Sequence, residues 1–192
     1  MYVWGRLLRL GLFAKTRPPL EAPFGVSELS FRAWPWDCDT NLHVTNGRYL
    51  MLADVGRLDL FLRFGLWREA MKRGWAPMLG GVSIVFRREI RMGGSFRLAS
   101  RLVTWQETHV VGEHLFHVGE DADARIAAKA LTWGGIYDRK GRRFVPPEEI
   151  FDLLGIKAAA PEPDEELAAF LASQRTLRAQ AKAMEGQQAA IA

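Results

Sequence analysis

The sequence has a single cysteine, Cys38, and therefore cannot form a disulfide within one chain. The absence of disulfides is typical of a reducing compartment, and we expect a cytoplasmic protein. The thiol is also a poor candidate for a catalytic nucleophile, because it lies between Asp37 and Asp39. Neighbouring carboxylates disfavour the thiolate and raise the pKa of a cysteine.

The sequence also lacks an apolar run long enough to cross a membrane. Its first segment, residues 1–17, is apolar but is interrupted by Arg6 and Arg9, and no small-residue cleavage site follows. It is too short and too charged for a transmembrane span or a secretory signal, so we expect neither. Such a segment can lie on an anionic membrane surface, but packing on its own domain or on a partner subunit is the commoner arrangement. We therefore assign residues 1–24 to an N-terminal arm and do not expect peripheral membrane contact.

Several catalytic and cofactor signatures are missing. Neither a Gly-x-Ser-x-Gly nucleophile elbow nor a phosphate-binding Gly-x-x-x-x-Gly-Lys loop occurs. The histidines do not indicate a metal site, because His114 and His117 would point to opposite faces of a strand and no tight carboxylate or cysteine cluster accompanies them. We expect no metal and no redox cofactor.

The composition is that of one globular domain with a substantial core. The 192 residues are 48% hydrophobic and include seven Trp and eleven Phe, enough to line an apolar cavity or a subunit interface as well as a core. The net charge of +4 suits an anionic ligand such as coenzyme A. Because the arginines are spread along the chain, we expect no nucleic-acid partner.

Residues 49–64 predict a long central helix. Apolar residues recur at helical spacing on two sides of this segment, as in a helix that is largely buried. The small residues Ala53 and Gly56 would let a neighbouring element approach one face closely, and this would explain a glycine that weakens the helix by roughly 1 kcal/mol. Gly65 would end the helix in a left-handed conformation.

A dense polar cluster directly precedes this helix and consists of Asp37, Asp39, Asn41, His43 and Asn46. Asn46 or Thr45 can cap the helix, whose first turn then offers free backbone N–H groups. Acyl transfer requires a base or nucleophile beside donors that hold a developing oxyanion, and this cluster could supply both. A loop that only caps a helix has the same composition.

The cluster resembles the signature of hotdog-fold thioesterases, in the form Asp39-x-Asn41-x-His43-x-x-Asn46-x-x-Tyr49 preceded by Asp37. It has the Asp-x-Asp of the 4-hydroxybenzoyl-CoA thioesterase type and the Asp-x-Asn-x-His of the plant acyl-carrier-protein thioesterase type. Downstream, Phe86-Arg87-Arg88-Glu89-Ile90, Val103-x-Trp105 and Glu113-His114-x-Phe116 look most like the member-six branch of the thioesterase superfamily. The resemblance covers about residues 25–150.

The resemblance implies an α+β hotdog fold, in which an antiparallel sheet wraps around the central helix. The order of predicted elements agrees with it. The expected strands are residues 26–33, 78–91, 95–106, 109–120 and 125–138. Short turns join the last four, so we expect each of these strands to pair with the next. We place the hotdog domain at residues 25–145 and a C-terminal helical extension at residues 146–192.

The activity implied by the resemblance is hydrolysis of a fatty or aryl acyl-CoA to the free acid and CoA. Asp39 would be the general base or nucleophile, while Asn41 and His43 would orient the water and the carboxylate. The residues expected to bind substrate are Asn46, Gly47, Arg48, Tyr49, Arg87 and Arg88. Arg87 and Arg88 are adjacent on a strand, so only one would face any given groove.

Three alternatives remain open from the sequence. The protein could hydrolyse thioesters of acyl-carrier protein, it could bind acyl-CoA or lipid without catalysis, or it could be a structural dimer. In each case we expect a homodimer or homotetramer, because a single wrapped sheet leaves an open edge and only half a cleft.

Overall fold

The computed structural model describes residues 4–13, 16–119 and 123–189, which belong to two compact units. The first unit, Met1–Ala160, holds the sheet and its helices, and the second, Pro161–Ala192, consists mainly of one long helix. Parts of the predicted arm (1–3 and 14–15), of a predicted strand and turn (120–122) and of the extension (190–192) lie outside the described residues.

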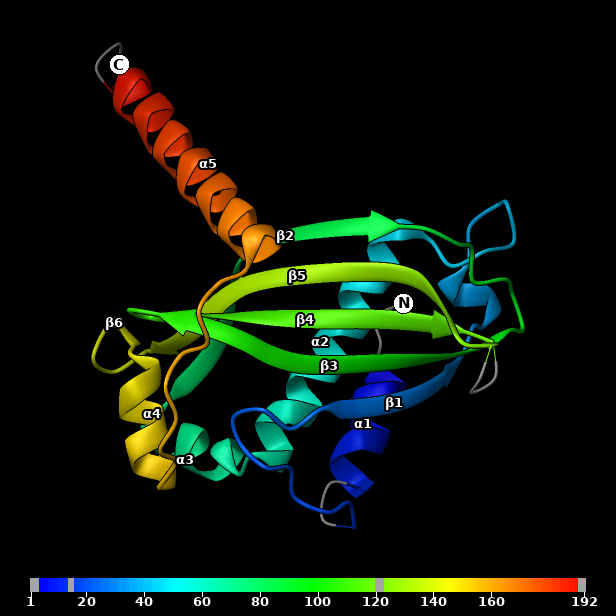
Figure 1. Ribbon diagram of the computed structural model, residues 1–192, viewed down its shortest axis with the longest axis horizontal. Helices are drawn as coiled ribbons and strands as arrows, with labels where there is room; N and C mark the ends of the chain where they lie inside the picture. Colours follow the sequence, from blue (N-terminus) through cyan, green and yellow to red (C-terminus); the bar gives the residue numbers. More distant parts are fainter. Residues whose placement is uncertain (1–3, 14–15, 120–122, 190–192) are drawn as a thin grey trace. The chain divides into compact units, whose positions relative to one another are not determined.

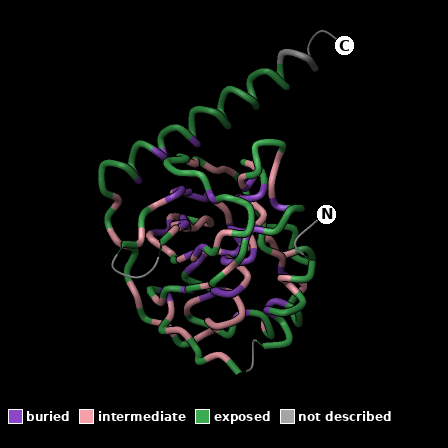
Figure 2. Tube along the Cα trace, turned by 90° about the vertical axis from the view of Figure 1, so that its right-hand side faces the viewer, coloured by how far each residue is buried: buried purple, intermediate pink, exposed green. Residues whose placement is uncertain are grey.

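The first unit has an antiparallel sheet in the strand order β1-β3-β4-β5-β2, with β6 paired to β5 (Figure 1). The strands are β1 (Ser27–Arg32), β2 (Trp75–Phe86), β3 (Ser95–Gln106), β4 (His109–Val118), β5 (Arg125–Asp138) and β6 (Arg143–Val145). The helices of the chain are α1 (Trp4–Phe13), α2 (Asn46–Arg63), α3 (Leu66–Arg73), α4 (Pro147–Leu154) and α5 (Glu165–Ala189), with a 3-10 turn η1 (Pro35–Asp37). The sheet curls around α2, and the buried residues gather inside the curl (Figure 2). The predicted α+β hotdog fold is confirmed.

The expected pairing of each strand with the next was wrong for β2 and β3. β2 pairs with β5 at one edge of the sheet, while β3 pairs with β1 at the other. The reason is that the turn before β3 is hydrogen-bonded to the end of β1. The amide of Ala33, just after β1, donates to the carbonyl of Gly94 at 2.9 Å, and the Ala33 carbonyl accepts from the amide of Gly93 at 2.8 Å. This exchange brings β3 beside β1.

Helix α2 packs against the sheet through the small face that the sequence predicted. A Cβ atom on Gly56 would overlap the hydroxyl of Ser100 on β3 and lie 3.2 Å from Cδ2 of Leu98. Ala53 is fully buried in the same core. Gly65 follows the helix with φ of 79°, a left-handed conformation that suits glycine.

A buried polar network lies under this helix. His114 on β4 contacts Ser100 Oγ through Nδ1 at 2.9 Å and Thr132 Oγ1 through Nε2 at 3.1 Å. Burial, and then the positive charge of Arg57, lower the pKa of His114 to about 3. The imidazole is therefore neutral and fully hydrogen-bonded in the folded protein.

A second core cluster closes the other end of the first unit. It contains Leu66 and Ala70 of α3, Trp75 of β2, Val145 of β6 and Ile150 of α4. Helix α4, which falls in the predicted C-terminal extension, thus packs within the first unit. In the second unit, the amide of Leu167 donates to the Asp164 carboxylate at 2.9 Å and so caps the start of α5.

Candidate active site

The polar cluster forms a narrow loop, residues 38–44, between η1 and α2. The amide of Asp39 donates to the carbonyl of His43 at 3.0 Å, and the amide of Leu42 donates to the carbonyl of Asp39 at 3.1 Å. Leu42 has a φ of 60°, which is uncommon for a leucine and is held in place by the bonds around it. The amide of Met92 donates to the Leu42 carbonyl and that of Val44 to the Ile90 carbonyl, so the loop is fixed on both sides.

Asp39 and His43 come together at the base of this loop. The imidazole Nδ1 lies 3.6 Å from Asp39 Oδ2, and both side chains are about one-third exposed. The other carboxylate oxygen accepts the backbone amide of Asn41 at 2.9 Å. Asn41 thus contacts Asp39 through its main chain, and its predicted part in orienting water stays a prediction.

The first turn of α2 leaves donors open beside this pair. The cap residue, Thr45, makes no side-chain bond to the helix, although its carbonyl accepts the Arg48 amide at 2.8 Å. The amides of Asn46 and Gly47 donate to no acceptor within the ranges that the structure describes. A Cβ atom on Gly47 would meet nothing within 4 Å, so the helix surface at this position is open. Such free amides form an anion-binding end of a helix.

Arg48 faces away from this open side and does not line the pocket described below. It is buried with its Nε 3.2 Å from Asp37 Oδ1, and its Nη2 donates to the Trp36 carbonyl at 2.6 Å. Asp37 is also buried and accepts two bonds from Arg6, at 2.9 and 2.6 Å, and one from the Trp34 amide at 2.9 Å. The two aspartates of the motif thus differ in role. Asp37 is buried and anchors the start of α2 through Arg48, whereas Asp39 is accessible to solvent.

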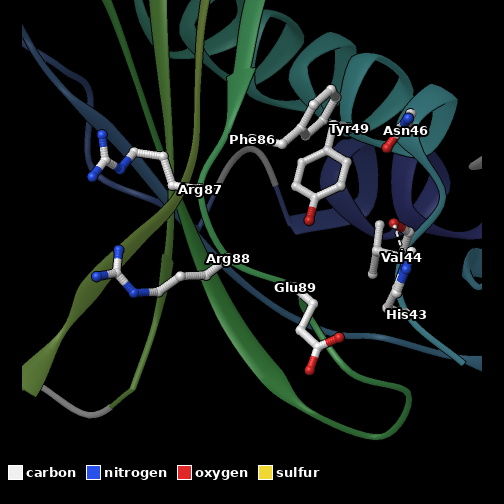
Figure 3. A pocket seen from close by; sticks show the side chains of 8 residues that line it. All are labelled: His43, Val44, Asn46, Tyr49, Phe86, Arg87, Arg88 and Glu89. Atoms are coloured by element: carbon white, nitrogen blue, oxygen red, sulfur yellow. Dashed lines mark hydrogen bonds between the residues drawn. The ribbon is translucent and has the colours of Figure 1, made fainter. Parts of the chain in front are cut away.

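A pocket of about 250 Å³ opens beside the loop (Figure 3). It is lined by His43, Val44, Asn46, Tyr49, Phe86, Arg87, Arg88 and Glu89. Five predicted site residues therefore lie around one pocket, whereas Asp39, Asn41, Gly47 and Arg48 are not part of its lining. Sequence reasoning missed Val44, Phe86 and Glu89 as lining residues, although Phe86 and Glu89 flank the arginine pair in the sequence.

Tyr49 directs its hydroxyl into this pocket (Figure 3). Its ring packs edge-on against Phe86 and Phe116, with centroid distances of 5.1 and 5.0 Å. Burial raises the pKa of Tyr49 to about 12, and a hydrogen bond from the Ile90 backbone offsets part of this rise. The phenol is therefore protonated at neutral pH and can donate a hydrogen bond.

The alternation expected for Arg87 and Arg88 was wrong. β2 ends at Phe86, and the amides of both arginines donate to the same carbonyl, that of Ala127, at 2.7 and 3.0 Å. This bulge-like bonding turns both side chains to the same side, away from His43 and Tyr49 (Figure 3). Arg88 Nη1 also donates to the Ile126 carbonyl at 3.0 Å.

Other chemistry finds little support around the loop. Burial, and then the carboxylates of Asp37 and Asp39, raise the pKa of the Cys38 thiol, so the thiolate is disfavoured. Within residues 4–13, 16–119 and 123–189, no three histidine, cysteine, aspartate or glutamate side chains come together as metal ligands. Among the helices that the structure describes, none has the length and apolar character needed to span a bilayer.

Comparison with known proteins agrees with the fold and the motif. The chain is 33% identical over 82 residues to Protein THEM6 of Xenopus laevis, an alignment that covers 43% of this chain and 40% of that protein. The structure is similar to the YbaW probable thioesterase of Escherichia coli, with a TM-score of 0.60, 18% identity and coverage of 66% of this chain and 95% of that one. It is also similar to the 4-hydroxybenzoyl CoA thioesterase of Pseudomonas sp. strain CBS-3, with a TM-score of 0.59, 18% identity and coverage of 67% and 98%.

The alignment with Protein THEM6 spans less than half the length of that relative. The two structural likenesses, both under 25% identical, concern the fold. A family match is more extensive, since it runs from residue 33 to residue 171 and so includes the loop, α2 and the whole sheet after β1. By this match, the chain belongs to the thioesterase-like superfamily.

Proposed function

We propose that this protein is an acyl-CoA thioesterase that hydrolyses a fatty or aryl thioester to the free acid and CoA. The observation that carries the proposal is the accessible Asp39–His43 pair beside two free amides at the start of α2. A carboxylate base next to preorganised donors is the arrangement that acyl transfer needs.

In the proposed reaction, the thioester carbonyl oxygen points at the amides of Asn46 and Gly47. Asp39 takes a proton from a water molecule, which attacks the carbonyl carbon. The amides stabilise the oxyanion that forms, and the positive end of the helix dipole adds to this effect. Collapse of the tetrahedral intermediate then breaks the C–S bond, and the CoA thiolate leaves and takes up a proton.

His43 is the proposed partner of Asp39 in moving this proton. Its ring lines the pocket, and its Nδ1 lies 3.6 Å from Oδ2 of the Asp39 carboxylate. A positioned acid or base contributes about 10²–10⁴-fold to turnover. In the simpler version of the proposal, Asp39 works with the helix amides alone and His43 only packs.

The pocket suits the acyl part of such a substrate. Val44, Tyr49 and Phe86 give it an apolar wall, and the Tyr49 hydroxyl offers one donor. Arg87 and Arg88 reach out from its rim to solvent, where a paired hydrogen bond to a CoA phosphate would form. That rim would equally accept the phosphate arm of an acyl-carrier protein.

We further propose that the active unit is a homodimer or homotetramer built on β2. This strand forms an edge of the sheet and exposes Met78, Leu79, Val85 and Phe86. A long apolar edge strand invites pairing with a second copy. Phe86 belongs to both the edge and the pocket, so a partner paired there would border the pocket and extend the cleft.

The test is hydrolysis of a panel of acyl-CoAs, followed with a thiol-reactive dye that reports released CoA. Asp39→Asn should abolish release, while the matched control Asp152→Asn, an exposed carboxamide substitution on α4, should leave it unchanged. Binding of acyl-CoA without release by the unmodified protein would instead identify a non-catalytic binding protein. The absence of both would leave a structural role for the fold.

A further inference from the structure

Helix α1 is apolar on two opposite sides, which is unusual for a helix at the surface of a domain. Its inner side packs on α2, where Leu10 is 6% exposed and lies against Val55. Its outer side presents a stripe at i, i+4 and i+8, made up of Trp4, Leu8 and Leu12, which are 69%, 66% and 69% exposed. Packing on the domain therefore accounts for only two of the six apolar residues of this helix, Leu7 and Leu10.

A cationic pocket opens beside the same helix. It has a volume of about 480 Å³ and lies between α1 and the paired strands β1 and β3. Arg9 of α1, Arg32 of β1 and Arg97 of β3 line it together with the hydroxyls of Ser30 and Ser95. No acidic side chain is among the described residues that line it. Guanidinium and hydroxyl groups in this number form a site for a phosphate.

Two exposed tryptophans adjoin this region. Arg6 of α1 donates to the Asp37 carboxylate and also to the Arg32 carbonyl, at 2.9 Å, and so ties the helix to η1. Trp34 and Trp36, which flank the proline of that turn, are exposed and stack on each other with ring centroids 5.4 Å apart. Tryptophan is enriched where one end of a side chain meets lipid and the other meets water.

We propose that this face, formed by α1 and the arginine-lined pocket, docks the protein on an anionic lipid bilayer. α1 would lie in the plane of the interface, with Trp4, Leu8 and Leu12 among the acyl chains and a lipid phosphate in the pocket beside Arg9. A helix of this kind buries its apolar face about 5–10 Å into the boundary between headgroups and chains. With ten residues, or about 15 Å of length, it lies on the bilayer and does not cross it.

The juxtaposition of stripe and pocket favours a bilayer over other occupants. A soluble phosphate compound would fill the pocket but leave the stripe in water. A second copy paired through α1 about a two-fold axis would cover the stripe but set two arginine-lined pockets side by side, with repulsion between like charges. An anionic bilayer satisfies the apolar and the charged part at the same time.

The experiment is co-sedimentation of the full chain with vesicles of phosphatidylcholine alone and of phosphatidylcholine with a minority of phosphatidylglycerol. We expect binding to the anionic vesicles only, and weaker binding as salt is raised. Arg9→Glu should weaken binding by at least about fivefold, the effect of one basic residue near a charged surface. The control Arg68→Glu, an exposed charge reversal on α3, should bind as the unmodified protein does.

A second pair of variants tests the stripe. Leu8→Glu should abolish vesicle binding, whereas Met71→Glu, which replaces an equally exposed residue on α3, should not. Both positions are exposed, so far-UV circular dichroism and melting temperatures should match those of the unmodified protein. Equal binding to both vesicle types, or none to either, would overturn the proposal. Two further outcomes would also overturn it. If Leu8→Glu lost self-association but still bound vesicles, the stripe would be a subunit interface. If Arg9→Glu lost only affinity for CoA, the pocket would be a nucleotide site.

Discussion

The Nδ1 atom of His43 lies 3.6 Å from the Oδ2 atom of Asp39, across a loop in which the backbones of the two residues are also hydrogen-bonded. The backbone bond fixes both Cα positions, so either side chain can be replaced without collapse of the loop. This arrangement allows their contributions to be separated by mutation.

We expect Asp39→Asn to abolish turnover and His43→Ala to lower it by about 10²–10⁴-fold, the range for a positioned acid or base. A proton-transferring imidazole also adds a limb to the pH–rate profile, which should disappear in His43→Ala. Steady-state kinetics of both variants over a pH series measure this. Near-normal turnover of His43→Ala with an unaltered profile would assign His43 to structure alone.

Gly47→Ala should lower turnover without weakening the fold. The position is open, so a methyl group causes no clash, and alanine favours a helix over glycine by up to about 1 kcal/mol. The same methyl group would stand beside the amide that is proposed to bind the thioester oxygen and would crowd a substrate bound there. Gly11→Ala, at an equally open glycine of α1, is the control and should keep full activity. Unchanged turnover in Gly47→Ala would remove this amide from the mechanism.

Gly56→Ala should destabilise the protein although alanine is the better helix former. The added Cβ meets the Ser100 hydroxyl, and overpacking of this kind costs about 1–3 kcal/mol. Gly56→Leu and Ala53→Leu should cost at least as much, since both positions are buried against the sheet. Denaturant unfolding of the three variants decides the matter, and unchanged free energies of unfolding would mean that this face of α2 is not closely packed.

The free energy of unfolding should decrease as the pH is lowered below about 6.5, because of His114. Its pKa is about 3 in the folded protein and near 6.5 when the chain is unfolded. Between these values the unfolded chain binds the extra proton, so acidification favours unfolding by up to about 1.4 kcal/mol per pH unit. His114→Gln, which keeps a polar side chain but does not titrate, should show a smaller slope of unfolding free energy against pH. An equal slope in the two proteins would contradict the burial of a neutral imidazole.

Leu79→Lys should disrupt the proposed dimer. Leu79 is exposed on the edge strand β2 but does not line the pocket, so a loss of activity would come from the assembly and not from substrate contact. Met71→Lys, an exposed apolar position on α3, is the matched control. Sedimentation velocity at micromolar concentration gives the oligomeric state, and a monomeric unmodified protein would exclude the proposal.

The central helix was predictable because its pattern is local. The apolar spacing of residues 49–64, the small face at Ala53 and Gly56 and the left-handed Gly65 are all written within twenty residues, and each was found in the structure. The resemblance in residues 37–49 identified the family for the same reason. Propensity and spacing act over short distances, and a single sequence displays them.

The parts that could not be predicted depend on distant partners. The strand order follows from the hydrogen bonds of Ala33 to Gly93 and Gly94, about sixty residues away. The length of the turn between β2 and β3 does not predict these bonds. The burial of Arg48 depends on Asp37, whose charge is shared with an arginine of the N-terminal arm. In the same way, the common direction of the arginine pair after β2 results from one carbonyl on β5 that accepts two amides.

The segment 90–94 has a consequence for protein engineering. It pairs with the loop at Leu42–Val44 on one side and, through its two glycines, with the end of β1 on the other. An insertion or deletion there would shift the loop and the register of β3 together, so this stretch should accept side-chain substitutions but not a change of length. Attempts to alter substrate choice are better directed at Val44 and Phe86, whose side chains border the pocket. Substitutions there change the pocket wall and leave the length of the chain between elements unchanged.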